Sequence, residues 1–258
     1  MITEDAPPLT VSGVSASYGK KTILQDISFS LKPAEVFGLV GLNGAGKTTL
    51  IRSILNLRIP DNGEALVFGQ PSSKPQARSK LVYLPERFHP APQLKGWEHL
   101  RILLKYFDRR VDRERAEALA VGLDLEPAAL DRRVRTYSKG MGQKLGLLGS
   151  ILVDTPLLIL DEPMSGLDPR ARVLLKDLLV KCRAEGRCIF FSSHILSDIE
   201  EICDRIGIIH DGRLIFLGTP GEFVARYTAP TLERAFLIAL EQAEYKDGGI
   251  RGLPGAAA

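Results

Sequence analysis

The run VFGLVGLNGAGKT, residues 36–48, limits the fold more than any other part of the sequence. A strand-like segment, VFGLV, leads into the pattern G-x-x-x-x-G-K-[ST] from Gly41 to Thr48, and apolar residues at helical spacing follow. A glycine-rich loop between a strand and a helix winds closely round an anion, because its backbone N–H groups and the helix N-terminus are directed at it. The run therefore predicts an α/β core that binds a nucleoside triphosphate.

Side chains of the same loop suit individual parts of such a ligand. Lys47 brings a positive charge for the β- and γ-phosphates, and Thr48 offers a hydroxyl to Mg²⁺. An idle glycine turn is the alternative, and the flanking strand and helix disfavour it. The helix after the loop is expected to run from Gly46 to about Leu57. The predicted nucleotide ligands in this region are Gly41, Asn43, Gly44, Ala45, Gly46, Lys47, Thr48 and Thr49.

The segment LLILDEP, residues 157–163, complements the loop. Its four apolar residues predict a buried strand that ends at Asp161, where a carboxylate can hold Mg²⁺ through water. Glu162 follows, and it is a candidate general base for an attacking water. Alone, the two acids would merely end a strand. Beside a phosphate loop they indicate a catalytic site in which Lys47 also takes part.

The order of strand-like and helix-like segments predicts how the chain is divided. β-Branched and apolar runs dominate residues 1–85 and 155–227, whereas residues 86–154 have a helical pattern. We therefore expect an α/β core interrupted by a helical subdomain, together making one nucleotide-binding domain over residues 1–227. Residues 228–258 are expected to form an amphipathic helix followed by a disordered tail, GGIRGLPGAAA.

Charge and hydropathy exclude several classes of function. Lys and Arg number 34 against 31 Asp and Glu, and the formal net charge of +3 is too balanced for a nucleic-acid-binding surface. No stretch approaches the roughly 18 apolar residues of a membrane-spanning helix, and the acidic start MITEDAPPLT is unlike a signal peptide. We expect no nucleic acid partner, and any role at a membrane would come through another protein.

Five motifs occur in a fixed order along the chain: GLNGAGKT, YSKGMGQK, LLILDEP, SGLDP and, after FFSS, His194. In this order and spacing they resemble the nucleotide-binding subunit of an ABC transporter, over roughly residues 9–240. The resemblance implies a P-loop NTPase (RecA-like) core with an N-terminal antiparallel β subdomain and an inserted α-helical subdomain. It also implies an ATPase that uses ATP and Mg²⁺ and dimerises with a second copy of itself on binding ATP. Such a subunit drives a separate integral membrane permease from the cytoplasmic face of the cell (inner) membrane.

The resemblance assigns roles to residues outside the phosphate loop. Tyr18 would stack on the adenine, although a strand-end aromatic is the plainer interpretation. His194 would contact the γ-phosphate and position water, with a surface or core histidine as the alternative. Asp168 would lie at the dimer interface, and it also suits the N-cap of a helix. Ser138 and Gly140 would face the γ-phosphate held by the other subunit, because a helix N-terminus favours an anion.

The sequence departs from the usual pattern of the family in two places. Lys139 and Met141 replace the first glycine and the glutamine of the signature L-S-G-G-Q, while Ser138 and Gly140 remain. The glutamine of the family's Q-loop is replaced by Glu86, whose carboxylate can still ligate Mg²⁺. Both variants resemble ABC subunits that serve export-type, ABC-2-like permeases.

Apolar residues outside the motifs leave two interpretations open. Trp97, with Leu94 and Leu100, either packs the core of the helical subdomain or lines a groove for a short helix of a membrane subunit. The C-terminal stripe of Phe236, Leu237 and Leu240 is expected to pack in the core.

Two other functions fit parts of the pattern. A soluble ABC-type ATPase acting on ribosomes, DNA or cofactor assembly would usually carry two cassettes, a long coiled-coil insertion or basic extensions, and we find none of these. A P-loop GTPase or kinase would leave the signature segment unexplained, and no N-K-x-D motif is visible. The transported substrate is left open, because the residues that contact it belong to the permease.

Overall fold

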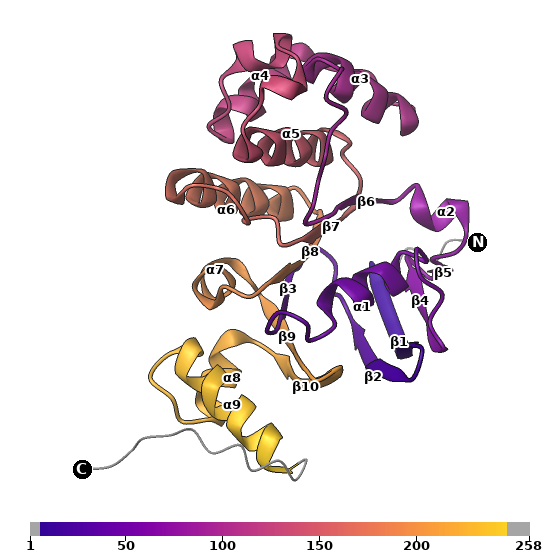
Figure 1. Ribbon diagram of the computed structural model, residues 1–258, viewed down its shortest axis with the longest axis vertical. Helices are drawn as coiled ribbons and strands as arrows, with labels where there is room; N and C mark the ends of the chain where they lie inside the picture. The colour runs from indigo at the N-terminus through magenta and orange to yellow at the C-terminus, as the bar shows by residue number, and fades with distance from the viewer. Residues whose placement is uncertain (1–5, 247–258) are drawn as a thin grey trace.

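A six-stranded, largely parallel sheet forms the centre of the molecule (Figure 1). The computed structural model describes residues 6–246, so the tail predicted to be disordered lies outside the described residues. All neighbouring strands are parallel except β10, which pairs antiparallel with β9. In spatial order the strands are β10 (Arg213–Gly218), β9 (Arg205–His210), β3 (Val36–Val40), β8 (Cys188–Ser193), β7 (Leu157–Asp161) and β6 (Leu81–Leu84).

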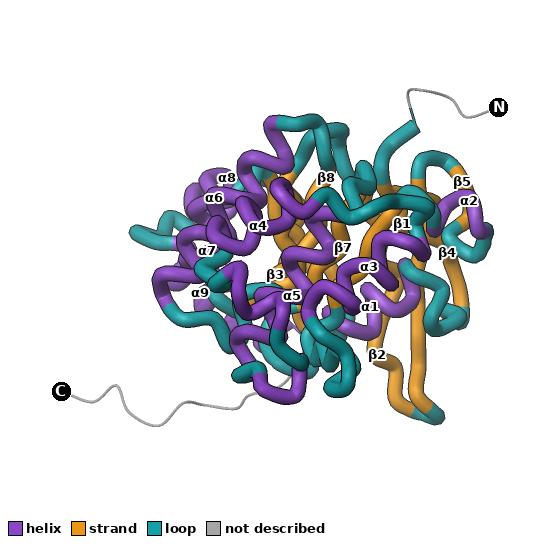
Figure 2. The backbone as a smooth tube through the Cα atoms, turned by 90° about the horizontal axis from the view of Figure 1, so that it is seen from above, coloured by secondary structure: helices purple, strands orange, loops and turns teal. Residues whose placement is uncertain are grey.

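A second sheet of four antiparallel strands packs against one face of the first. Its strands, in spatial order, are β2 (Lys21–Ser30), β1 (Leu9–Tyr18), β4 (Asn62–Val67) and β5 (Gln70–Pro71). Between the sheets the rings of Phe29, Phe37 and Phe190 stack, with centroids 5.2 to 5.9 Å apart. Figure 2 shows this second sheet on one side of β3, β7 and β8, with helices α6 to α9 on the other.

Side chains of the central strands alternate between two cores, as the period of a strand requires. On β3, Phe37 and Leu39 point toward the second sheet, while Val36 and Val40 point toward the helices. Because both faces are covered, these strands read as continuous apolar runs in the sequence. The predicted α/β core is therefore confirmed.

The two sheets are also joined at one end. The backbone N–H of Gln25 on β2 donates to the carbonyl of Gly212 in the turn between β9 and β10, at 2.8 Å. Arg213 donates twice to the side-chain oxygen of Gln25, at 3.0 and 2.9 Å. A Cβ on Gly212 would lie 2.2 Å from the carbonyl oxygen of Ile23, so only glycine allows this approach.

Helix α1 (Lys47–Ile54) follows the phosphate loop and is shorter than expected, since the prediction extended it to about Leu57. It stops because Asn56 takes a left-handed φ of 52°. The N–H groups of Asn56 and Leu57 then bond back to Ser53 and Arg52, at 3.1 and 2.9 Å. This is the Schellman pattern of a helix end. A short helix, α2 (Pro75–Arg78), was not predicted.

The helices expected in residues 86–154 lie together at one end of the molecule (Figure 1). Trp97 and Leu100 are only 6% and 0% exposed and belong to the core, which confirms the packing interpretation. The elements here are α3 (Gly96–Tyr106), α4 (Arg113–Gly122), the 3-10 helices η1 (Pro127–Asp131) and η2 (Val134–Thr136), and α5 (Lys139–Leu152).

The remaining helices cover the other face of the central sheet. They are α6 (Pro169–Ala184), α7 (Leu196–Ile202), α8 (Pro220–Arg226) and α9 (Leu232–Lys246). In α9 the core prediction is confirmed for Phe236 and Leu240 and is wrong for Leu237, which is 51% exposed because it lies on the outer side of the helix. None of the helices within residues 6–246 has the length and apolar character needed to span a membrane.

Candidate functional site

The phosphate loop connects the carboxyl end of β3, an inner strand of the central sheet, to the start of α1. Gly46, the N-cap of α1, has a φ of 109° that only glycine adopts readily, and a Cβ there would lie 2.8 Å from the Leu24 side chain. A Cβ on Gly41 would lie 2.6 Å from the carbonyl oxygen of Ile209. Both glycines of the motif are therefore required by close backbone packing.

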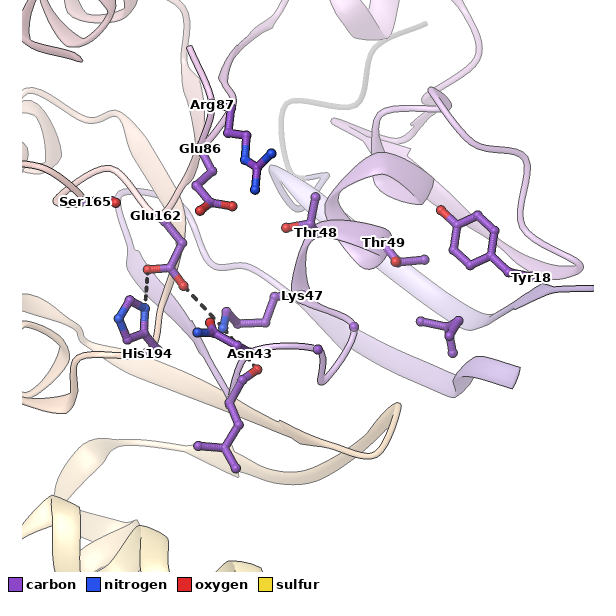
Figure 3. A pocket seen from close by; sticks show the side chains of 14 residues that line it. Tyr18, Asn43, Lys47, Thr48, Thr49, Glu86, Arg87, Glu162, Ser165 and His194 are labelled. Carbon is purple, nitrogen blue, oxygen red and sulfur yellow. Dashed lines mark hydrogen bonds and ion pairs between the residues drawn. The ribbon is translucent and has the colours of Figure 1, made fainter. Parts of the chain in front are cut away.

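The loop borders a cavity of about 500 Å³ (Figure 3). Most residues predicted from the sequence meet here, although they come from β1, the loop, α1 and the ends of β6, β7 and β8. The predicted residues that line it are Tyr18, Asn43, Gly44, Gly46, Lys47, Thr48, Thr49, Glu86, Glu162 and His194.

At the centre of the site, one carboxylate holds two partners. Glu162 Oε1 lies 3.2 Å from Lys47 Nζ, and Glu162 Oε2 lies 2.8 Å from His194 Nδ1 (Figure 3). Lys47 also donates to the carbonyl of Gly41 at 2.7 Å. Lys47 and Glu162 are buried, whereas the side chain of His194 is partly exposed. The carboxylate of Glu162 is thus in direct contact with both an ammonium and an imidazole.

The backbone at Glu162 is strained in a way that positions the side chain. Its φ is 48°, in the left-handed region that a non-glycine residue seldom occupies. The buried hydroxyl of Ser192 on β8 compensates, because it accepts the Glu162 N–H at 2.9 Å and donates to Asp161 Oδ1 at 2.6 Å. One serine therefore fixes both consecutive acids.

Asp161, at the end of β7, has one carboxylate oxygen without a partner in the described part of the chain. Its Oδ2 is buried and has no hydrogen-bond partner among the residues that the structure describes. Burial raises the pKa of the carboxyl, and hydrogen bonding to Ser192 opposes that shift. Thr48, Glu86 and Asp161 line a second cavity of about 300 Å³ beside the phosphate loop.

These oxygen donors fit Mg²⁺. Within residues 6–246 there is no cluster of three His, Cys, Asp or Glu side chains that could hold a metal unaided. Mg²⁺ does not need one, since it keeps several waters and is held by one or two carboxylates together with substrate phosphates. The unpartnered oxygen of Asp161, with the Thr48 hydroxyl nearby, is what such an ion requires.

Some predicted residues do not line the cavity of about 500 Å³ at the phosphate loop. Ala45 is buried within the loop, and the carbonyl of Gly41 holds Lys47. Asp168 accepts the N–H of Ala171 at 2.9 Å as the N-cap of α6, and this bond lowers the pKa of its carboxyl. The predicted N-cap is therefore present.

The signature segment lines a cavity beside the one at the phosphate loop. Ser138 is the N-cap of α5, and its Oγ accepts the N–H of Met141 at 3.2 Å. Ser138 lines this neighbouring cavity, of about 810 Å³, which shares Glu86, Arg87 and Ser165 with the first. A Cβ on Gly140 would lie 3.2 Å from the carbonyl oxygen of Gly166, so this end of the helix packs closely on the loop after β7.

Sequence reasoning missed several residues of the site. Ser192 was seen only as part of a strand, and nothing in FFSS signals its bond to Asp161. Arg87 and Ser165 also line the cavity. Arg87 directly follows the recognised segment VYLPE, and Ser165 is the first residue of the motif SGLDP, in which only Asp168 was given a role.

Comparison with known proteins decides the family. The sequence profile of the family described as ABC transporter matches residues 24–165. This chain belongs to the ABC transporter family. Its P-loop NTPase fold with an antiparallel β subdomain is as expected.

Several relatives of this ABC subunit are known by sequence. "Uncharacterized ABC transporter ATP-binding protein all4389" of Nostoc sp. is 39% identical over 80% of this chain and 62% of its own length. "Nod factor export ATP-binding protein I" of Ralstonia nicotianae is 35% identical over 84% of this chain and 69% of its own length. "Linearmycin resistance ATP-binding protein LnrL" of Bacillus subtilis is 33% identical over 90% and 78%. The chain thus spans less than two thirds of the Nostoc relative.

Solved structures agree with the fold. A structure titled "Structure of ATP binding subunit of ABC transporter" is 30% identical, with a TM-score of 0.82 over 90% of this chain and 98% of that one. The "Dimeric Structure of MJ0796, a Bacterial ABC Transporter Cassette" has a TM-score of 0.75 at 20% identity, over 82% and 98%. The second likeness concerns the fold alone.

Proposed function

We propose that this ABC subunit binds and hydrolyses ATP with Mg²⁺, dimerises with a second copy of itself on binding ATP, and drives a separate membrane-embedded permease. Export is the proposed direction, since relatives are named for Nod factor export and linearmycin resistance. The proposed location is the cytoplasmic face of the cell membrane, where the permease would hold the subunit. No feature of the described residues specifies the cargo.

The observation that carries the proposal is the direct contact of Lys47, Glu162 and His194 at one cavity. Lys47 would bind the β- and γ-phosphates as the cation of the loop. Glu162 would accept the proton of the attacking water, and His194 would orient that carboxylate and contact the γ-phosphate. Tyr18 would stack on the adenine at the other end of the cavity.

Thr48, Glu86 and Asp161 would hold Mg²⁺, which supplies electrostatic stabilisation of the phosphate charge. Asp161 would do so in its ionised form. Burial raises the pKa of its carboxyl, and the positive charge of a bound Mg²⁺ would lower it again. The phosphates would compete with Glu162 for the ammonium of Lys47, since both are anions that it can pair with. Binding of the phosphates would therefore free Glu162 to act as the base.

Dimerisation would complete the site. Ser138 and Gly140 are at the N-terminus of α5, where N–H groups and the helix dipole favour an anion. They lie outside the described lining of the chain's own nucleotide cavity, so we infer that they contact the γ-phosphate held by the other copy. Asp168 would lie at the same interface.

The test is the variant Glu162→Gln. The amide keeps the reach of the side chain but cannot take a proton, so turnover should fall by about 10²- to 10⁴-fold. ATP should still bind, and a dimer should accumulate in ATP and dissociate in ADP, as read by size exclusion. Glu117→Gln, the same change at an exposed site on α4, should behave as wild type. Near-normal hydrolysis by Glu162→Gln would place the base elsewhere, with His194 the next candidate.

A further inference from the structure

The guanidinium of Arg58 packs on the ring of Tyr18, the last residue of β1. The side chain of Tyr18 is 50% exposed and lines the nucleotide cavity. The guanidinium carbon of Arg58 lies 4.0 Å from the centroid of the Tyr18 ring, within cation–π range. Tyr18 lines the cavity and Arg58 does not, so one face of the ring is taken by a residue that does not border the ligand space.

The fold holds Arg58 in this place from both ends. Its backbone N–H bonds to the carbonyl of Arg52, at 3.1 Å, as part of the turn that ends α1. Its Nη2 donates to the carbonyl of Ser17, next to Tyr18. Arg58, four residues after the end of α1, is thereby tied to the end of β1, 41 positions away in sequence.

The guanidinium makes this contact at a cost. Arg58 Nε is buried and has no hydrogen-bond partner among the residues that the structure describes. A buried donor without a partner lowers stability. The site therefore favours stacking of the guanidinium on Tyr18 over full hydrogen bonding.

We propose that Arg58 is a positioning residue for the base of the nucleotide: it fixes the Tyr18 ring for stacking and does not touch the ligand. The inference rests on the proposed function, because it takes Tyr18 as the adenine platform. An ordered ring loses less conformational freedom when the base arrives. A cation on one face also draws electron density from the other, which favours an electron-rich purine there.

Isothermal calorimetry with two ligands tests the proposal: ATP, and inorganic triphosphate, which has no base. Loss of a cation–π contact at a partly exposed site predicts an ATP affinity about two- to fivefold weaker in Arg58→Met. Triphosphate affinity should not change. Arg58→Lys, which keeps the charge, should retain most of the ATP affinity. Lys20→Met removes an exposed cation two residues from Tyr18 and should change neither affinity.

A double-mutant cycle identifies the partner through which Arg58 acts. In a Tyr18→Ala background, Arg58→Met should weaken ATP binding no further, because no ring is left to position. Equal losses for ATP and triphosphate, additive losses in the Tyr18→Ala background, or unchanged ATP binding in Arg58→Met would each overturn the inference. Wild-type protein that binds neither ligand would instead contradict the proposed function, and the two failures are thus distinguishable.

Discussion

At the scale of single residues, the site consists of groups that already contact one another. Glu162 contacts Lys47 and His194, and Ser192 fixes the backbone of Glu162 together with the side chain of Asp161. The proposal gives these side chains different tasks. Substitutions should therefore separate binding, metal use and proton transfer.

Lys47→Ala tests phosphate binding. It removes the cation of the loop, so ATP affinity should fall by at least tenfold, since charge-assisted bonds to phosphate are among the strong ones. Calorimetric titration with ATP measures the loss. Lys74→Ala, at an exposed site before α2, is the matched control and should bind as wild type. Unchanged affinity in Lys47→Ala would contradict the assignment of the phosphate loop.

Two substitutions of Glu86 test whether its side chain binds the metal. Glu86→Gln keeps an oxygen donor at the cavity shared with Thr48 and Asp161, so hydrolysis should be mildly affected. Glu86→Ala removes the donor, and half-maximal activity should then require more Mg²⁺. Hydrolysis measured across a Mg²⁺ titration distinguishes them, and identical curves for both variants and wild type would exclude a role in metal binding.

At the scale of elements, the glycines of the phosphate loop and of α5 have opposite roles. Gly46→Ala would place a Cβ 2.8 Å from Leu24 at a φ of 109°, and we expect a loss of about 1–3 kcal/mol in the free energy of unfolding. Gly142→Ala, within α5, meets no described atom within 4 Å, and helix propensity predicts a gain of up to about 1 kcal/mol. Urea unfolding of both variants measures the change in the free energy of unfolding. A change of the same sign in both would contradict the prediction.

Much of the architecture could be predicted because local patterns decide it. The strand, loop and helix around residues 36–54 follow from sequence periodicity and glycine spacing alone. Helix α8 was missed although its signals are present, since Thr219 and Glu222 form a capping box around Pro220. The end of α1 was likewise misplaced although a signal is present, since Asn56 takes the left-handed backbone that asparagine, after glycine, adopts most readily at a helix end.

The parts of the site that could not be predicted depend on contacts between distant segments. Family motifs identify Lys47, Asp161 and Glu162, because each motif contains its own functional residue. Ser192 and Asp161, which share a hydrogen bond, are 31 positions apart in sequence. The cation–π contact of Arg58 with Tyr18 also joins distant segments of the chain. No local pattern encodes such pairs, so only the fold reveals them.

At the scale of the whole molecule, the separation of Ser138 from the chain's own phosphate loop predicts complementation between two defective subunits. Lys47→Ala and Ser138→Arg should each be inactive alone. A mixed dimer contains one intact site, with the phosphate loop of the Ser138→Arg chain facing the signature of the Lys47→Ala chain. Mixing the two proteins should therefore restore hydrolysis, as measured by phosphate release.

The design has an internal control. Glu162 contacts Lys47 of its own chain, so the intact site uses the base of the Ser138→Arg chain. Adding Glu162→Gln to that chain should abolish the restored activity, whereas adding it to the Lys47→Ala chain should not. Activity of Ser138→Arg alone, or no recovery on mixing two folded and ATP-competent preparations, would argue against a shared site in the isolated protein.

The bonds of Gln25 and Arg213 hold β2 against the turn after β9, and Gly46 packs on Leu24 of the same strand. Strand β2 pairs with β1, which ends at Tyr18, so these contacts tie the aromatic ring to the phosphate loop through the protein itself. We therefore expect the separation of Tyr18 and Lys47 to change little when a ligand binds. If so, the length of a ligand as well as its charge decides whether it contacts both residues at once, and a nucleoside monophosphate should bind more weakly than ATP.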